Sequence, residues 1–181
     1  EADYTTASWA VYQAIVDDNV VTDQNLQPEV DTATANITAG QANLIEIADL
    51  TAYNLALSAV VEADYTTASW AIYQAIVDDN VVTDQNLQSE VDTATANITA
   101  AQANLIEIAD LTGYNAALSA VVEADYTTAS WAIYQAIVDE NVVTEQNLQL
   151  EVDTATANIT AAQANLIEIA DLSAYNLALS A

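Results

Sequence analysis

Hydrophobic and small residues recur along the chain with the spacing of a helix face. Between positions 87 and 108 the successive spacings are 4, 3, 4, 3, 4 and 3 residues: Leu87, Val91, Ala94, Ile98, Ala101, Leu105 and Ile108. This heptad pattern predicts one long amphipathic helix near 87–109. Two shorter stripes predict helices near 67–80 and 112–123: Trp70, Tyr73 and Val77 in the first, and Tyr114, Leu118 and Val121 in the second.

The pattern belongs to a sequence repeat. The stretch DYTTASWA stands at 3–10, 64–71 and 125–132, so Trp9, Trp70 and Trp131 are 61 residues apart (70 − 9 and 131 − 70). A fixed period of this kind is typical of tandem helical repeats. We therefore expect an all-α chain: a rod-like tandem array of three up-down-up three-helix bundles with a 61-residue period.

The repeat predicts where the domains begin and end. Residues 1–49 would be an incomplete first repeat with its second and third helices, and 50–110 and 111–171 would be complete repeats of three helices. Residues 172–181 would begin a further repeat, as in a fragment of a longer array. Hydroxyl side chains mark helix starts: Thr66 is a predicted N-cap, and so are Thr51, Thr112 and Ser173 at the start of the tyrosine-bearing helix.

The charge is of one sign. The 181 residues include 27 Asp and Glu, and no Lys, Arg, His or Cys, while 53% of them are hydrophobic. No salt bridge between side chains can form, and binding to nucleic acid or to an anionic membrane surface is excluded, because both need cationic side chains. The longest uncharged runs, such as 93–106, have 14 residues and are too short to insert into a membrane.

Two stretches of each repeat resemble a known family. DYTTASW, followed by Tyr, Ala and Val on one face, and SEVDTATANI at the start of the long helix are similar to the FIVAR repeats of large bacterial cell-surface proteins. The resemblance covers the 61-residue unit three times. It implies three-helix bundles of adhesins and surface-bound enzymes, with a suspected affinity for sugars.

The repeated tryptophans have two interpretations. Trp9, Trp70 and Trp131 lie on a helical stripe, which favours burial in the bundle. The alternative is a carbohydrate-binding adhesin module, in which each indole ring stacks on a sugar beside polar neighbours. We also expect one of these rings, Trp70, to lie opposite the small residues of the long helix, Gly40 and Ala101.

The carboxylates also have two interpretations. In stacked bundles, Glu107 and Asp110 of one repeat approach Asp139, Glu140 and Glu145 of the next, and the equivalents in the middle repeat are Asp78, Asp79 and Asp84. Carboxylate oxygens suit hard cations, so these junctions are candidate Ca²⁺ sites that would set the stiffness of the array. The other interpretation is a solvated acidic surface that opposes aggregation, with no cofactor required.

Two further site predictions concern modification and catalysis. Asn36, Asn97 and Asn158 each begin the triplet NIT, which fits the glycosylation rule. Each lies within the long helix. An enzyme is not expected, because carboxylates and tyrosines are the only acid–base groups and a small bundle offers little cleft to desolvate them.

The sequence therefore predicts a mechanical function. The chain would be a repeated spacer, stalk or fibre unit of a large extracellular or cell-surface protein. Its partners would be neighbouring repeats of the same chain and like chains in a fibre. The absence of Lys and Arg leaves no site for trypsin-like proteases, which suits an exposed position.

Overall fold

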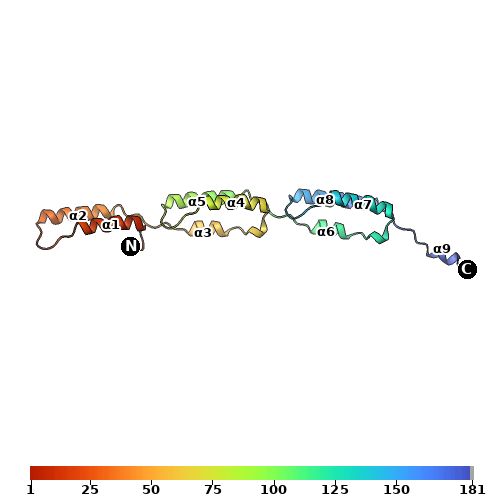
Figure 1. Ribbon diagram of the computed structural model, residues 1–181, viewed down its shortest axis with the longest axis horizontal. Coiled ribbons are helices and arrows are strands. Elements are labelled where there is room, and N and C mark those ends of the chain that lie inside the picture. Colours follow the sequence, from red (N-terminus) through yellow and green to blue (C-terminus); the bar gives the residue numbers. More distant parts are fainter. Residues whose placement is uncertain (180–181) are drawn as a thin grey trace. The chain divides into compact units, whose positions relative to one another are not determined.

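The computed structural model describes residues 1–179, and this part of the chain is helical (Figure 1). It contains nine α-helices: α1 Thr6–Asp18, α2 Gln27–Gln41, α3 Thr51–Ser58, α4 Thr67–Asp79, α5 Gln88–Gln102, α6 Thr112–Ser119, α7 Thr128–Glu140, α8 Gln149–Gln163 and α9 Ser173–Leu179. Two 3₁₀ turns, η1 Glu62–Asp64 and η2 Glu123–Asp125, precede α4 and α7. The all-α prediction is confirmed.

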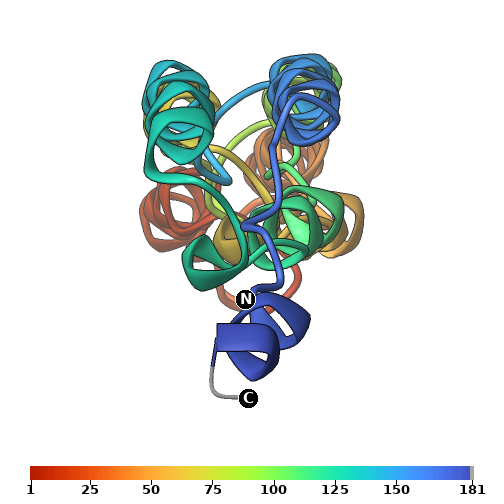
Figure 2. The same cartoon turned by 90° about the vertical axis from the view of Figure 1, so that its right-hand side faces the viewer.

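Residue contacts divide the chain into two compact units. The first combines Glu1–Val61 with Ala71–Leu105, and the second combines Glu62–Trp70 with the chain from Ile106 onward. In the first unit α1 packs on α2 and α3 packs on α5. In the second unit α6 and α7 both pack on α8, and Figure 2 shows α7 and α8 side by side with α6 below them. The division into repeats ending at 49, 110 and 171 stays a prediction.

Each unit buries most of the apolar stripe that the sequence predicts, although Leu87, at the start of the predicted seam, is 48% exposed. In the second unit a cluster of buried side chains joins three helices: Tyr114 and Ala117 of α6, Tyr134 of α7, and Val152, Ala155 and Ile159 of α8. In the first unit the predicted seam of α5 is buried at Val91, Ala94, Ile98 and Ala101. Ile98 and Ile159 are fully buried, so the centre of each seam lies in a core.

The long helix is shorter than predicted. It ends at Gln102 instead of near 109, so Leu105 and Ile108 continue the heptad spacing outside the helix. The backbone after Gln102 is used in tertiary hydrogen bonds: Thr66 N donates to Ile106 O at 2.7 Å and Ile108 N donates to Asp64 O at 3.1 Å. These bonds replace the helical ones, which explains why apolar periodicity overestimated the helix.

The tyrosine-bearing helix is also shorter than predicted, and its cap differs. α6 ends at Ser119 instead of near 123. Thr112 is its first helical residue and not its N-cap, because Thr112 N donates to the Asp110 carboxylate at 2.8 Å. The cap prediction for Thr66 is confirmed, since its hydroxyl accepts a hydrogen bond from Ser69 N at 3.4 Å.

The small residue of the long helix does not face a tryptophan. A Cβ atom on Gly40 would lie 3.1 Å from Ile15 Cδ1 and 3.4 Å from Tyr12 Cδ2. The close approach of α1 and α2 at this point is therefore made by an isoleucine and a tyrosine. The expectation that a tryptophan lies opposite is wrong in this copy, since the indole is one helical turn away from Tyr12.

In the described part of the chain, no helix combines the length and the apolar character that a membrane crossing needs.

Candidate functional site

The tryptophans are half-buried between tyrosines. Trp131 lies against the core of the second unit. Its ring is stacked with Tyr126 at a centroid distance of 6.3 Å and tilted against Tyr134 at 5.1 Å. In the first copy, Trp9 is placed in the same way between Tyr4 and Tyr12. This aromatic packing favours a structural role, in which the indole ties the DYTTASW turn to the core.

Several predicted cation-site carboxylates bind glutamine side chains. Asp78 accepts a hydrogen bond from Gln74 Nε2 at 2.9 Å, and Asp139 accepts one from Gln135 Nε2 at 3.0 Å. Both pairs lie within a single helix. Asp84 accepts a hydrogen bond from Gln85 Nε2 at 3.1 Å. These carboxylates thus accept hydrogen bonds from side-chain amides, because the chain has no lysine, arginine or histidine to pair with them.

The other acidic candidates lie close to backbone hydrogen bonds. Glu107 pairs with Tyr65 in an isolated antiparallel bridge, and the backbone carbonyl of Glu145 accepts a hydrogen bond from Ala109. The pKa of Asp110 lies below its ordinary value, because Thr112 donates to its carboxylate through its side chain and its backbone N–H. Asp79 is exposed in the last turn of α4. Within residues 1–179, no three acidic side chains are grouped so that they could hold a metal ion.

The asparagines of the NIT triplets link two helices. The Nδ2 atom of Asn158 donates to Asn141 Oδ1 at 2.8 Å, and Asn97 and Asn36 make the same bond to Asn80 and Asn19. These three side chains are exposed, but the nitrogen to which a glycan would be attached already has a partner. Glycosylation would replace one of the two hydrogens on this nitrogen, and the other would have to be the one that bonds to the neighbouring asparagine.

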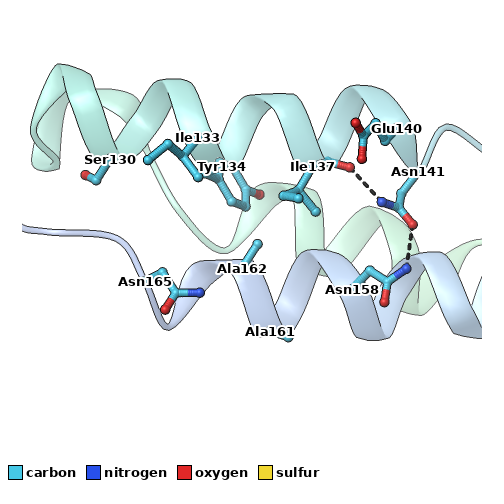
Figure 3. A pocket seen from close by; sticks show the side chains of 10 residues that line it. All are labelled: Ser130, Ile133, Tyr134, Ile137, Glu140, Asn141, Asn158, Ala161, Ala162 and Asn165. Carbon is cyan, nitrogen blue, oxygen red and sulfur yellow. Dashed lines mark hydrogen bonds between the residues drawn. The ribbon is translucent and has the colours of Figure 1, made fainter.

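A groove follows the exposed side of α7 and α8. It has a volume of about 380 Å³ and is lined by the residues drawn in Figure 3, among them Ile133, Ile137 and Ala161 on its apolar side and Asn141 and Asn158 on its polar side. Glu140, one of the candidate cation ligands, lies at its rim. Two of its three asparagines, Asn141 and Asn158, bond to each other, so these two side chains offer fewer free polar groups to a ligand.

The buried tyrosine of the groove wall differs between copies. Tyr134 is 3% exposed, and its hydroxyl has no hydrogen-bond partner among the described residues. In the first copy, Tyr12 Oη accepts a hydrogen bond from Gln41 Nε2 at 3.3 Å. The matching Gln163 donates instead to the carbonyl of Ala117 on α6, which it holds against α8. The same glutamine thus serves a tyrosine in one copy and a neighbouring helix in the other.

The most extensive polar site is a junction between successive copies of the repeat. In the first unit, Ala48 N donates to Asp84 O at 2.8 Å. Thr6 N donates to Gln85 Oε1 at 2.7 Å, and Asp49 N donates to Gln88 Oε1 at 2.8 Å. We call Thr6, Ala48 and Asp49, with their counterparts in the other copies, the donor edge. We call Asp84, Gln85 and Gln88, with their counterparts, the acceptor loop.

The second unit contains the same junction one repeat later. Ala109 N donates to Glu145 O at 2.8 Å. Thr67 N and Asp110 N donate to the side-chain oxygens of Gln146 and Gln149 at 2.7 and 2.8 Å. Thr67 is the first residue of α4, where a helix leaves its N–H groups without partners. The neighbouring repeat supplies the missing acceptors, so each junction completes a helix start.

Carboxylates orient the two glutamines of the acceptor loop. Gln85 Nε2 donates to Asp84 at 3.1 Å, and Gln88 Nε2 donates to Asp92 at 2.9 Å. With each Nε2 held by a carboxylate, the Oε1 atom is turned toward the donor edge. The acidic residues near the junction therefore position neutral hydrogen-bond acceptors.

The junction also buries an alanine. Ala48 and Ala109, in the two formed junctions, are 6% and 7% exposed. Ala170 occupies the same place in the third copy and is exposed. The segment LIEIADL around it is identical in all three copies. Burial of this alanine therefore accompanies contact with the next acceptor loop.

Sequence reasoning missed the four glutamines that make the junctions: Gln85, Gln88, Gln146 and Gln149. An exposed glutamine carries no periodicity signal and no charge. The sequence nonetheless contained a signal. Both glutamines of the acceptor loop are the same in the second and third copies, although Asp79 and Asp84 nearby are replaced by Glu140 and Glu145.

Comparisons with known proteins identify no relative: the chain matches no protein-family model, no curated protein and no solved structure. The resemblance to FIVAR repeats therefore stays a prediction.

Proposed function

We propose that this chain is a structural spacer, in which three-helix bundles with a 61-residue period are joined end to end in a rod-like array. The two junctions carry this proposal. Each uses three hydrogen bonds of 2.7–2.8 Å from a donor edge to an acceptor loop, made by equivalent residues in both units. A spacer needs such a repeated, direct connection between neighbours.

The surface chemistry supports a place outside the cell or on its surface. With no Lys or Arg, the chain offers trypsin-like proteases no cleavage site. Its single-sign charge opposes aggregation and non-specific binding to anionic surfaces. The resemblance of DYTTASW and SEVDTATANI to FIVAR repeats of bacterial surface proteins agrees with this location.

Cations have a limited part in this proposal. The junction hydrogen bonds join backbone N–H groups, and the Nε2 atoms of Gln88 and Gln149, to neutral oxygens, and no carboxylate oxygen takes part in them. Na⁺ and Ca²⁺ are therefore expected to act by screening the 27 carboxylates, with equal effects at equal ionic strength. A larger effect of Ca²⁺ would favour specific cation sites at the junctions.

Small-angle X-ray scattering tests the spacer directly. The unchanged chain is expected to scatter as a stiff, extended particle. Alanine in place of the junction glutamines Gln85, Gln88, Gln146 and Gln149 should broaden the distribution of distances. Alanine at Gln13, Gln74 and Gln135 is the matched control, since these side chains bond only within their own helices. If the junction variant scatters like the control, the proposed connection between repeats is wrong.

A further inference from the structure

Two hollows on α7 and α8 join into one groove. The groove of Figure 3 has a volume of about 380 Å³. A second hollow, of about 400 Å³, lies at the turn between the two helices and is lined by Val142 and Leu150. Glu140 and Asn141 line both hollows, so the two are continuous. We call them together the side groove.

The side groove has the length of a short helix. Its lining on α8 includes Leu150 near one end of the helix and Ala162 near the other. Twelve residues separate these positions (162 − 150), which is about 18 Å at 1.5 Å per residue. A groove between two packed helices is a common docking place for a further helix.

The side groove exposes three large aliphatic side chains. Ile133, Val142 and Leu150 are 67%, 68% and 74% exposed. They lie on the face that α6 does not cover, because Trp131 and Val138 are the residues of α7 that pack on the buried cluster shared with α6. Covering these three side chains would remove apolar surface from water and would stabilise a complex.

The same face is exposed in the second copy, which is preceded and followed by a copy of the repeat. Ile72 and Val81, the counterparts of Ile133 and Val142, are 64% and 70% exposed. A hollow of about 380 Å³ lined by Val81 and Glu90 lies at the turn between α4 and α5. The contacts between repeats therefore leave this face uncovered.

The side groove carries negative charge. Glu140 and Glu151 line it, and the chain has no Lys, Arg or His to pair with them. Glu140 is the last residue of α7, where the helix dipole disfavours an anion, and no described residue donates a hydrogen bond to its carboxylate. A cation supplied from outside would therefore stabilise Glu140.

We propose that the side groove binds an amphipathic helix of a partner protein, with apolar residues on one face and lysine or arginine beside them. The apolar face covers Ile133, Val142 and Leu150, and the cations lie against Glu140 and Glu151. A second copy of this chain does not fit, because it has a net charge of −27 and no cation to offer. The inference goes beyond the spacer function and does not depend on the junctions, since α7 and α8 form the groove by themselves.

Fluorescence anisotropy of a labelled peptide tests the proposal on the whole chain in about 0.15 M NaCl. The probe has about 14 residues, all leucine or lysine, with the leucines on one helix face. A second peptide of the same composition has its leucines spread around the helix. The first peptide should bind at least about tenfold more tightly than the second and should gain helical circular dichroism on binding.

Serine substitutions in all three copies locate the binding site. Val11→Ser/Ile72→Ser/Ile133→Ser removes an exposed aliphatic side chain from each copy of the groove and should weaken binding at least about tenfold. Serine at three exposed leucines that do not line these hollows is the matched control and should change the affinity less than about twofold. These leucines precede the long helices: Leu26, Leu87 and Leu148.

A second set of variants separates the groove carboxylates from the overall charge. Asp18→Asn/Asp79→Asn/Glu140→Gln removes one carboxylate from each copy of the groove and should weaken binding about threefold. The control removes the same number of charges elsewhere and should have less than about half of this effect. It replaces three glutamates by glutamine: Glu1, Glu62 and Glu123.

Three results would overturn the proposal. Equal affinity for the two peptides would mean a non-specific attraction between opposite charges. Serine variants that bind like their control, with unchanged circular dichroism, would place the peptide elsewhere on the chain. Sedimentation equilibrium without peptide tests the occupant: the unchanged chain should stay at 19.2 kDa, and self-association that the groove serines abolish would make a second copy the partner instead.

Discussion

The segments around Ala109 and Ala170 have the same sequence and different surroundings. Both belong to LIEIADL, and both follow a long helix that ends at the same point of the repeat. Ala109 is 7% exposed and donates its N–H to Glu145, whereas Ala170 is exposed and its N–H has no acceptor among the described residues. The comparison teaches that contact with the following repeat decides whether this alanine is buried, since Ala109 belongs to the buried cluster of α6, α7 and α8 as well as bonding to the acceptor loop.

The first prediction places a negative charge at each of the two alanines and compares the losses of stability. Ala109→Glu is expected to lower the free energy of unfolding by about 3 kcal/mol, because a carboxylate would be buried without a cation. Ala170→Glu is the matched control and should change it by less than about 0.5 kcal/mol. Urea denaturation followed by circular dichroism measures both. Equal effects at the two positions would show that the junction does not bury Ala109.

The second prediction separates core packing from the junction. Trp131→Ala should lower the free energy of unfolding by about 2 kcal/mol, since the indole is half-buried between Tyr126 and Tyr134. Ile133→Ala, on the same helix but 67% exposed, should cost less than about 0.5 kcal/mol. Urea denaturation distinguishes them. A negligible loss of stability in Trp131→Ala would instead favour the alternative interpretation, in which the ring stacks on a sugar.

The third prediction compares the same two glutamines in an occupied loop and in the open one. Gln146→Ala/Gln149→Ala should lower the free energy of unfolding by about 1 kcal/mol, through the loss of bonds from Thr67 N and Asp110 N. Gln24→Ala/Gln27→Ala in a dilute monomeric sample should leave it nearly unchanged. Thermal unfolding of both variants provides the test, and a larger loss in the open loop would contradict the assignment.

The fourth prediction is that the same substitution, tyrosine to phenylalanine, changes the free energy of unfolding in opposite directions in two copies of the repeat. Tyr134→Phe should raise the free energy of unfolding by about 0.5 kcal/mol, because it removes a buried hydroxyl that has no partner among the described residues. Tyr12→Phe should lower it by about 0.5 kcal/mol, because Gln41 loses its acceptor. Urea midpoints at pH 7 are sufficient to determine the sign. The same sign in both copies would mean that the two hydroxyls have equivalent surroundings.

The fifth prediction concerns pH. The pKa of Glu151 lies below its ordinary value of 4.5, because Asn147 and the Leu148 N–H donate to its carboxylate. A lowered folded-state pKa means that the stabilisation is present above the ordinary pKa and is lost as the pH falls through the folded value. The difference in melting temperature between the unchanged chain and Glu151→Gln should therefore be constant near neutral pH and vanish below the lowered pKa. A difference that grows in acid would reverse the sign.

The sequence predicted the helices and their buried faces better than it predicted their ends. The apolar period correctly placed Val91, Ala94 and Ile98 in a core, because helical side chains repeat every 3.6 residues. It also extended the helix to Ile108, where the backbone in fact bonds to Asp64. Periodicity describes side chains and carries no information on which carbonyl a backbone N–H group reaches.

The junction could not be predicted from charge. The carboxylates Asp84 and Asp110 drew attention to the ends of the repeat, and the structure places them near the junction. The groups that join the repeats are the neutral oxygens of Gln85 and Gln88, which depend on the fold of a loop. A single sequence can locate such a surface, but the hydrogen bonds across it follow from tertiary structure.

The most direct test of the junction is amide hydrogen exchange measured by NMR. The account predicts that Ala109 N and Asp110 N exchange at least about tenfold more slowly than Ala170 N and Asp171 N, their counterparts in the open donor edge. The differing residues Thr112 and Ser173 allow the two segments to be assigned separately. Equally fast exchange at Ala109 and Ala170 would contradict the claim that the acceptor loop of the next repeat binds this edge.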